Sequence, residues 1–144
     1  MRLNGFRRVL AMMAAGGLVL VGFPALAQDP SSEASRAAFR EIYREMIEID
    51  SSPTTGSCTA VVRAAETRLN AAGFGADDLH VVIPEGRPDD GNIVAIIRGP
   101  DRTKQGVLLL AHIDVVEAKR EDWERDPFAL FEEDGFFYAR GATD

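Results

Sequence analysis

The sequence predicts an α/β fold in which helices flank a mixed β-sheet. Three observations lead to this expectation. Two stretches near residues 33–72 repeat apolar residues at helical spacing, several short apolar runs follow them, and one of these runs is apolar at every position. A run of that last kind is typical of a central strand covered by helices on both faces. A hydrophobic content of 46% and a charged content of 27% exclude a disordered tail.

The two helices are predicted from apolar spacing and from end signals. The first begins in the polar sequence at residues 29–32, ends near Asp50, and has one apolar face made of Phe39, Ile42, Tyr43, Met46 and Ile49. The second runs from about Cys58 to Ala72, and Gly73 is its expected C-terminal stop. The polar residues 51–56 between them read as a loop.

Four further segments are predicted to be extended. Residues 79–83 and 93–97 form two short apolar runs, and residues 107–111 form the fully apolar run expected at the centre of the sheet. Residues 130–138 contain two runs around Asp134 and Gly135, a pair that is typical of a tight hairpin turn. Helices followed by several strands therefore indicate a mixed sheet.

The N-terminus has the pattern of a secretory signal peptide. Arg2, Arg7 and Arg8 give a positive start, residues 9–22 are apolar, and a small-x-small cleavage pattern ends at Ala27. The alternative is a retained membrane anchor, but the apolar run is shorter than the roughly 20 residues of a spanning helix. We expect residues 1–27 to be removed and residues 28–144 to be exported, to the periplasm or the extracellular space, with no stable membrane span after cleavage.

Charge and cysteine content narrow the function classes. The net charge is −7, and the three arginines of residues 1–27 leave about −10 on the remainder. An acidic chain of this kind does not suit nucleic acid, whose phosphates need a basic surface. Cys58 is the only cysteine, so neither an internal disulfide nor a thiolate-rich zinc cluster can form. At the start of a helix Cys58 could be a reactive thiol, but we favour a packing role because no histidine is near it in sequence.

His112 and Asp114 follow the fully apolar run. Residues two apart in an extended chain point to the same face, and the carboxyl end of a strand is where open α/β sheets bind ligands. A neutral imidazole there can ligate a metal while a neighbouring carboxylate fixes its ring. This pair by itself also fits a structural histidine that only makes hydrogen bonds.

An ordered series of motifs extends from this pair to the end of the sequence. The series consists of His112-Ile113-Asp114-Val115-Val116, then Trp123, then Asp126-Pro127-Phe128, then Asp134-Gly135, and then Arg140-Gly141-Ala142-Thr143-Asp144. It resembles the zinc-dependent aminoacylase and carboxypeptidase family of metallopeptidases (clan MH), which includes acetylornithine deacetylase, succinyl-diaminopimelate desuccinylase and carboxypeptidase G-like enzymes. The resemblance covers residues 107–144, and residues 33–98 are compatible with it.

The resemblance implies roles for individual residues. His112 would ligate one metal ion, Asp114 would be the active-site carboxylate that orients His112, and Asp144 would bridge two metal ions. Arg140 and Gly141 would shape the turn that carries Asp144. The implied metal is zinc, two ions in a complete site, with cobalt or manganese as alternatives.

The resemblance also implies a reaction. The full-length parent would hydrolyse an amide bond with a zinc-activated water, acting on a dipeptide, a peptide with a free C-terminus or an N-acyl amino acid. Residues 28–144 would be the N-terminal portion of its catalytic domain, without the lid or dimerisation domain of a homodimeric parent. The general base and the other ligands would lie beyond Asp144, so we expect the 144 residues to be inactive alone. The alternative is a non-catalytic exported α/β domain that keeps a partial metal site.

Two positions depart from the pattern of that family. Ala139 stands where glycine is common, and Glu117 stands where proline is frequent, which we expect to loosen the loop without removing a ligand. Trp123 and Phe128 are expected to pack the connecting loop. His80 matches no motif of the family and is expected to be structural or exposed.

Overall fold

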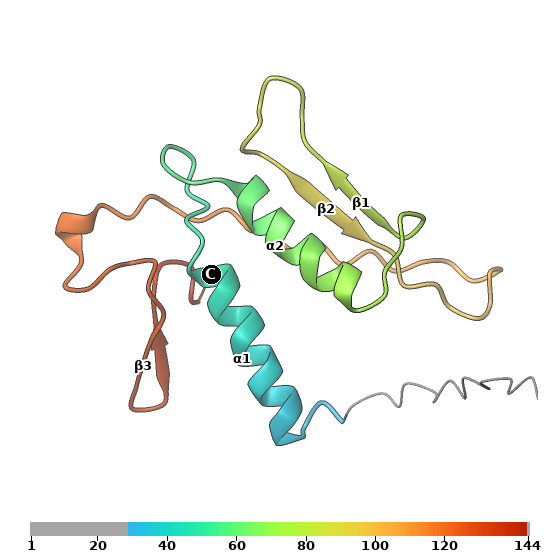
Figure 1. Ribbon diagram of the computed structural model, residues 1–144, viewed down its shortest axis with the longest axis horizontal. Coiled ribbons are helices and arrows are strands. Elements are labelled where there is room, and N and C mark those ends of the chain that lie inside the picture. The colour runs from blue at the N-terminus through green and yellow to red at the C-terminus, as the bar shows by residue number, and fades with distance from the viewer. Residues whose placement is uncertain (1–28, 144) are drawn as a thin grey trace, which may run out of the picture.

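The computed structural model describes residues 29–143 (Figure 1). Its elements, in chain order, are α1 (Glu33–Ile47), α2 (Cys58–Ala71), β1 (Leu79–Val82), β2 (Asn92–Ala95), a short 3-10 helix (Arg120–Asp122), β3 (Phe131–Glu133) and β4 (Phe136–Tyr138). The predicted signal peptide at residues 1–27 lies outside the described residues. Within those residues, no helix has the length and apolar character needed to cross a bilayer.

Both predicted helices are confirmed, and the structure shows a serine at the N-cap of each. Ser32 caps α1 and Ser57 caps α2, and each side chain accepts a hydrogen bond from the backbone N–H three residues later, at 3.1 and 3.2 Å. Helix α1 ends at Ile47, slightly before the expected end near Asp50. Gly73 follows α2 with a φ of 97°, the left-handed conformation that glycine adopts at helix ends.

The first sheet is an antiparallel pair of β1 and β2 that packs against α2 (Figure 1). Leu79 pairs with Ala95 and Val82 pairs with Asn92, so the two predicted runs are confirmed with shorter bounds. The buried hydrophobic side chains of residues 29–143 are few: Val61 and Val62 on α2, and Leu130 before β3. Helix α2 therefore provides most of the small core.

The second sheet is the predicted hairpin of β3 and β4. Asp134 and Gly135 have φ values of 52° and 82°, as a type I′ turn requires at both central residues. The hairpin packs on α1, where the ring centroids of Tyr43 and Phe137 lie 5.3 Å apart and Arg40 pairs with Glu132 at 3.1 Å. This contact attaches the end of the described chain to the first helix.

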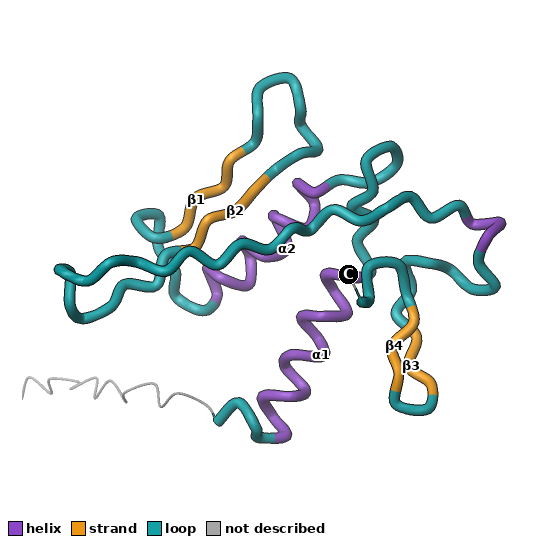
Figure 2. The backbone as a smooth tube through the Cα atoms, turned by 180° about the vertical axis from the view of Figure 1, so that it is seen from behind, coloured by secondary structure: helices purple, strands orange, loops and turns teal. Residues whose placement is uncertain are grey.

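The expected central strand at residues 107–111 is wrong, and so is the mixed sheet built around it. These residues form no strand, and Figure 2 shows them as part of a long loop that runs past β2. The side chains of Val107, Leu108, Leu109 and Leu110 are 76–88% exposed. A central strand needs a hydrogen-bonded neighbour on each side, but within residues 29–143 β1 pairs only with β2 and β3 only with β4. The structure therefore contains helices and two separate antiparallel hairpins.

Candidate functional site

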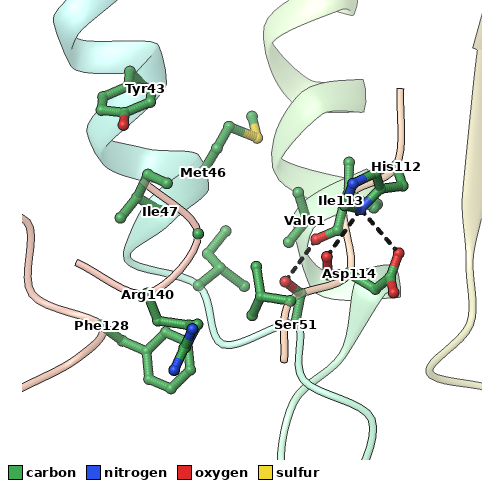
Figure 3. Close-up of a pocket in the computed structure, with 13 residues that line it drawn as sticks. Tyr43, Met46, Ile47, Ser51, Val61, His112, Ile113, Asp114, Phe128 and Arg140 are labelled. Carbon is green, nitrogen blue, oxygen red and sulfur yellow. Dashed lines mark hydrogen bonds and ion pairs between the residues drawn. The ribbon is translucent and has the colours of Figure 1, made fainter. Parts of the chain in front are cut away.

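His112 and Asp114 lie together on the segment that follows the exposed apolar run. The Nδ1 atom of His112 is 3.1 Å from the backbone oxygen of Asp114 and 3.3 Å from its Oδ1 atom (Figure 3). A proton on Nδ1 satisfies both oxygens, which leaves Nε2 as the ring nitrogen with a free lone pair. The structure thus brings the two predicted side chains together, while their catalytic and metal-binding roles stay predictions.

The surroundings of this pair differ from the sequence expectation. The pair does not emerge from the end of a buried strand, and the side chains of His112 and Asp114 are 60% and 66% exposed. On one side they border an open hollow of about 390 Å³, with polar groups from Cys58, Arg87 and Asp90. On the other side they border a hollow of about 200 Å³ whose lining is mostly apolar and includes three residues of α1 and one of α2 (Figure 3). Both sides of the pair are therefore accessible to small molecules or ions.

The loop at residues 50–57 holds the 112–117 segment at two points. Ser51 is only 3% exposed, and its hydroxyl donates a 2.7 Å hydrogen bond to the backbone oxygen of Ile113 (Figure 3). The backbone N–H of Thr54 donates to Oε1 of Glu117 at 2.8 Å, and the Thr54 hydroxyl donates to the same oxygen. We expected Glu117 to loosen the loop that contains it. That expectation is wrong, because the Glu117 carboxylate ties its own loop to the 50–57 loop.

The 50–57 loop is itself braced by Asp50. One carboxylate oxygen of Asp50 accepts the Ser52 N–H at 2.9 Å and the other accepts the Thr55 hydroxyl at 2.8 Å. Partial burial of this carboxyl opposes its ionisation, but the hydrogen bonds from Ser52 and Thr55 outweigh that effect and lower the pKa of Asp50. The loop is thus stabilised by a carboxylate that is ionised at neutral pH.

Cys58 begins α2 beside the larger hollow. Burial raises the pKa of its thiol, and the carboxylates of Asp114 and Asp90 raise it further. The Sγ atom lies 3.8 Å from the backbone oxygen of Ser51. A thiol that stays protonated at neutral pH is a poor nucleophile, which supports the packing role over the reactive one.

The turn at residues 139–142 lies beside the 112–117 segment. Gly141 has a φ of 78°, and a Cβ atom at this position would be 2.6 Å from Cγ1 of Val115. The hydroxyl of Tyr43 donates to the backbone oxygen of Ala142 at 2.6 Å, and the N–H of Arg140 donates to the backbone oxygen of Pro127 at 2.7 Å. The turn that precedes Asp144 is thereby brought close to Asp114. Asp144 lies outside the described residues, so its bridging role stays a prediction.

Aromatic and cationic side chains pack the loop that connects the 112–117 segment to the turn at residues 139–142. The guanidinium of Arg140 lies 5.1 Å from the ring centroid of Trp123, and Phe128 lines the smaller hollow. The Nε atom of Arg140 is buried without a hydrogen-bond partner among residues 29–143. These contacts agree with a packing role for Trp123 and Phe128.

No pattern in the sequence indicated the anchoring roles of Tyr43, Ser51 and Thr54. Tyr43 was expected only on the apolar face of α1, and the two hydroxyl residues only in a loop. Each acts on a residue at least 62 positions away in the chain, at Ala142, Ile113 and Glu117 respectively. Such contacts depend on the tertiary fold and leave no local pattern.

The donors present suit zinc in kind but not in number. An imidazole nitrogen and carboxylate oxygens are zinc ligands, and the Nδ1 contact of His112 is the usual support of a metal-bound histidine. Within residues 29–143, however, no three side chains of His, Cys, Asp or Glu are grouped so that they could hold a metal ion. His112 and Asp114 therefore fit one ligand and the carboxylate that orients it.

The comparisons with known proteins agree with the motifs around this site. The model of peptidase family M20/M25/M40 matches residues 108–144. These residues belong to that family. The match contains the His112 and Asp114 pair and the Gly141 turn, so the family predicted from these motifs is confirmed.

Several curated relatives align with parts of the chain, and we call residues 108–144 the M20 segment. The chain is 52% identical over 48 residues to N-fatty-acyl-amino acid synthase/hydrolase PM20D1 of Mus musculus, which is 33% of this chain and 10% of that protein. It is 31% identical over 106 residues to aminoacylase-1 of Sus scrofa, 72% of this chain and 24% of that protein. It is 40% identical over 98 residues to succinyl-diaminopimelate desuccinylase of Cupriavidus taiwanensis, 64% of this chain and 23% of that protein. The chain thus spans about a quarter or less of these relatives. No solved structure matches it.

Proposed function

We propose that this chain contributes to the catalytic domain of a metal-dependent hydrolase that cleaves amide bonds in small substrates. The observation that carries the proposal is the His112 Nδ1 contact with Asp114, which lies inside the M20 segment. The names of the relatives support it, since they describe an aminoacylase, a desuccinylase and a hydrolase of N-fatty-acyl amino acids. The proposed substrate is accordingly an N-acyl amino acid, with a dipeptide or a peptide with a free C-terminus as the alternatives.

In the proposed mechanism His112 would hold one metal ion with its Nε2 nitrogen. Asp114 accepts the Nδ1 proton, which fixes the tautomer that presents a lone pair on Nε2 and holds the ring in one orientation. Asp144 would supply a carboxylate to a site that we propose to hold two zinc ions. When bound, such ions lower the pKa of a water molecule and polarise the scissile carbonyl group.

The proposed location is outside the cytoplasm, in the periplasm or the extracellular space. It is supported by the charged start, apolar run and cleavage pattern of residues 1–27. A cleavage product that begins at Gln28, identified by mass spectrometry of the exported protein, is the expected result. Recovery of the uncleaved chain from membranes alone would favour the anchor instead.

Zinc binding provides the direct test of the site. His112→Ala is compared with His80→Ala, since these are the two histidines of the chain. Because residues 29–143 group few metal donors, we expect the 144-residue chain to bind zinc only weakly in a direct titration, and His112→Ala to lose at least about tenfold in affinity. Asp114→Ala is expected to lose about tenfold, the usual effect of removing a residue that supports a metal-bound histidine. Equal affinities of the His112→Ala and His80→Ala variants would contradict the proposal.

An activity assay tests the expectation that these residues are inactive alone. With zinc or cobalt present, we expect no turnover of N-acetyl amino acids or dipeptides, because residues 29–143 do not group enough metal donors. Turnover that is lost in His112→Ala would contradict that expectation while supporting the hydrolase assignment.

A non-catalytic exported α/β domain is the second candidate. The incomplete donor group within residues 29–143 favours it. Zinc affinity that is the same in the wild type, His112→Ala and His80→Ala would support this candidate over the hydrolase.

A further inference from the structure

We propose that Thr54 and Glu117 form a side-chain clamp that positions His112 and Asp114 against the start of α2. Both are positioning residues, because neither is one of the residues to which the site chemistry is assigned. The clamp is supported by the hydrogen bonds between Thr54 and Glu117. Its effect on metal binding rests on the proposed function.

Along the chain, the clamp holds the segment after Asp114, and a second hydrogen bond holds it before Asp114. Ser51 holds Ile113, immediately before Asp114, through a 2.7 Å hydrogen bond to its backbone oxygen. Thr54 holds Glu117, three residues after Asp114, with both its backbone N–H and its hydroxyl. A segment fixed at both ends has fewer accessible backbone conformations than one fixed at a single end. Removing the Thr54–Glu117 contact leaves Asp114 held from one side only.

The loop that supplies the clamp is firmly attached to the helix. The backbone oxygen of Asp50 accepts the N–H of Ser57 at 2.8 Å, and that of Ser52 accepts the N–H of Gly56 at 3.0 Å. A Cβ atom on Gly56 would lie 2.4 Å from the backbone nitrogen of Ser52, so the loop closes tightly on itself. Helix α2 begins directly after this loop and contributes two of the three buried hydrophobic side chains of residues 29–143. The clamp therefore connects the site segment to the best-packed helix.

In the described part of the chain, the apolar run just before His112 is not held in a comparable way. Leu109 and Leu110 are 88% and 87% exposed, and the residues around them form no strand. The position of the imidazole thus depends on contacts made after it in the chain. A carboxylate at position 117 can accept both hydrogen bonds from Thr54, whereas the proline expected there has no side-chain acceptor.

The test uses the metal-free 144-residue chain and the NMR signals of its two imidazole rings. Glu117→Ala removes the acceptor, Glu117→Gln keeps a side-chain oxygen, and Thr54→Val removes only the hydroxyl. Glu124→Ala is the matched control, because Glu124 is exposed on the same connecting region. We expect Glu117→Ala to change the position or width of the His112 ring signals and to leave those of His80 in β1 unchanged.

Amide hydrogen exchange measures how strongly the clamp restricts the backbone. We expect the Thr54 N–H to exchange about three- to tenfold faster in Glu117→Ala, because it donates to the Glu117 carboxylate in the wild type. Thr54→Val is expected to have a smaller effect, because its N–H still donates to Glu117. Glu117→Gln is expected to remain within about twofold of the wild type, and the exchange of α1 is expected to stay the same.

Two results would overturn the clamp. One is identical His112 signals and exchange rates in Glu117→Ala and Glu124→Ala. The other is a uniform acceleration across both helices, which would show a general stabilising role instead of local positioning. Zinc titration of the histidine variants keeps the two proposals apart. If the wild type shows the clamp but His112→Ala and His80→Ala bind zinc equally well, the proposed function fails while the clamp stands.

Discussion

Two neighbouring parts of the chain, residues 99–111 and residues 112–117, are held in opposite ways. The first has an almost entirely apolar end, yet its leucines are exposed and the hydrogen bonds of Asp101 go only to Thr103, two residues away. The second carries exposed polar residues but is fixed by the distant Ser51 and Thr54.

The difference shows that apolar character alone does not place a segment. An apolar run is buried only where other elements cover it, and its backbone groups need partners when it is removed from water. The polar segment needs no such cover, because a few side-chain hydrogen bonds to a braced loop are enough to place it. A partly assembled core can therefore still carry an ordered local arrangement of candidate site residues.

The largest expected effect on stability comes from placing a charge at a buried position and, for comparison, in the exposed apolar run. Val62→Asp places a carboxylate at a position that is 0% exposed, whereas Leu109→Asp places it at one that is 88% exposed. We expect Val62→Asp to destabilise the fold by at least about 3 kcal/mol, enough to remove the cooperative thermal transition seen by circular dichroism. Leu109→Asp is expected to leave the transition nearly unchanged. Equal destabilisation by both would mean that residues 107–111 are buried in solution.

The second-largest effect is expected from two glycines with similar backbone angles, which test whether the 139–142 turn contacts the 112–117 segment. Gly141 and Gly86 have φ values of 78° and 75°, but only a side chain at Gly141 would collide with Val115. Gly86→Ala is expected to cost about 1 kcal/mol for its left-handed backbone, and Gly141→Ala about 2–3 kcal/mol because the clash adds to the same strain. Urea unfolding measures both, and Gly141→Ala should also alter the NMR signals of Val115. Equal costs would show that the turn does not lie against the site segment.

Acid sensitivity gives the smallest expected effect. Hydrogen bonds that outweigh partial burial hold the pKa of Asp50 below its ordinary value of 3.8, so its stabilising effect is present above that pH and is lost as the pH falls through the lowered value. We expect a loss of less than about 1 kcal/mol below pH 4, since the group is only partly buried. Faster amide exchange of residues 50–57 between pH 5 and pH 3, after correction for intrinsic rates, would report it.

The control for this effect is Asp101. Its pKa is also lowered, by hydrogen bonds from Thr103, but it lies in the exposed segment. Asp50→Asn is expected to remove the acid response of the loop, and Asp101→Asn is expected to leave it unchanged. An acid response that persists in Asp50→Asn would assign it to another carboxylate.

Much of the local structure could be predicted from the sequence because it depends on local interactions. The apolar spacing and the polar or glycine end signals determined α1 and α2, and the Asp134-Gly135 pair determined the hairpin turn, since each acts within a few residues. The motif series from His112 to Gly141 likewise determined the family, because it depends on residue type and order. The pairing of His112 with Asp114 also follows from two positions in one short segment.

Only the tertiary structure decided how the site segment is held and whether the apolar run is covered. Both depend on contacts between residues far apart in the chain. The sequence at residues 107–111 specifies a preference for burial, but a strand forms only where a neighbouring strand supplies hydrogen bonds. The roles of Ser51, Thr54 and Glu117 arise because the 50–57 loop meets the 112–117 segment in space. Serine, threonine and glutamate are ordinary surface residues in sequence, and it is this meeting that makes them anchors.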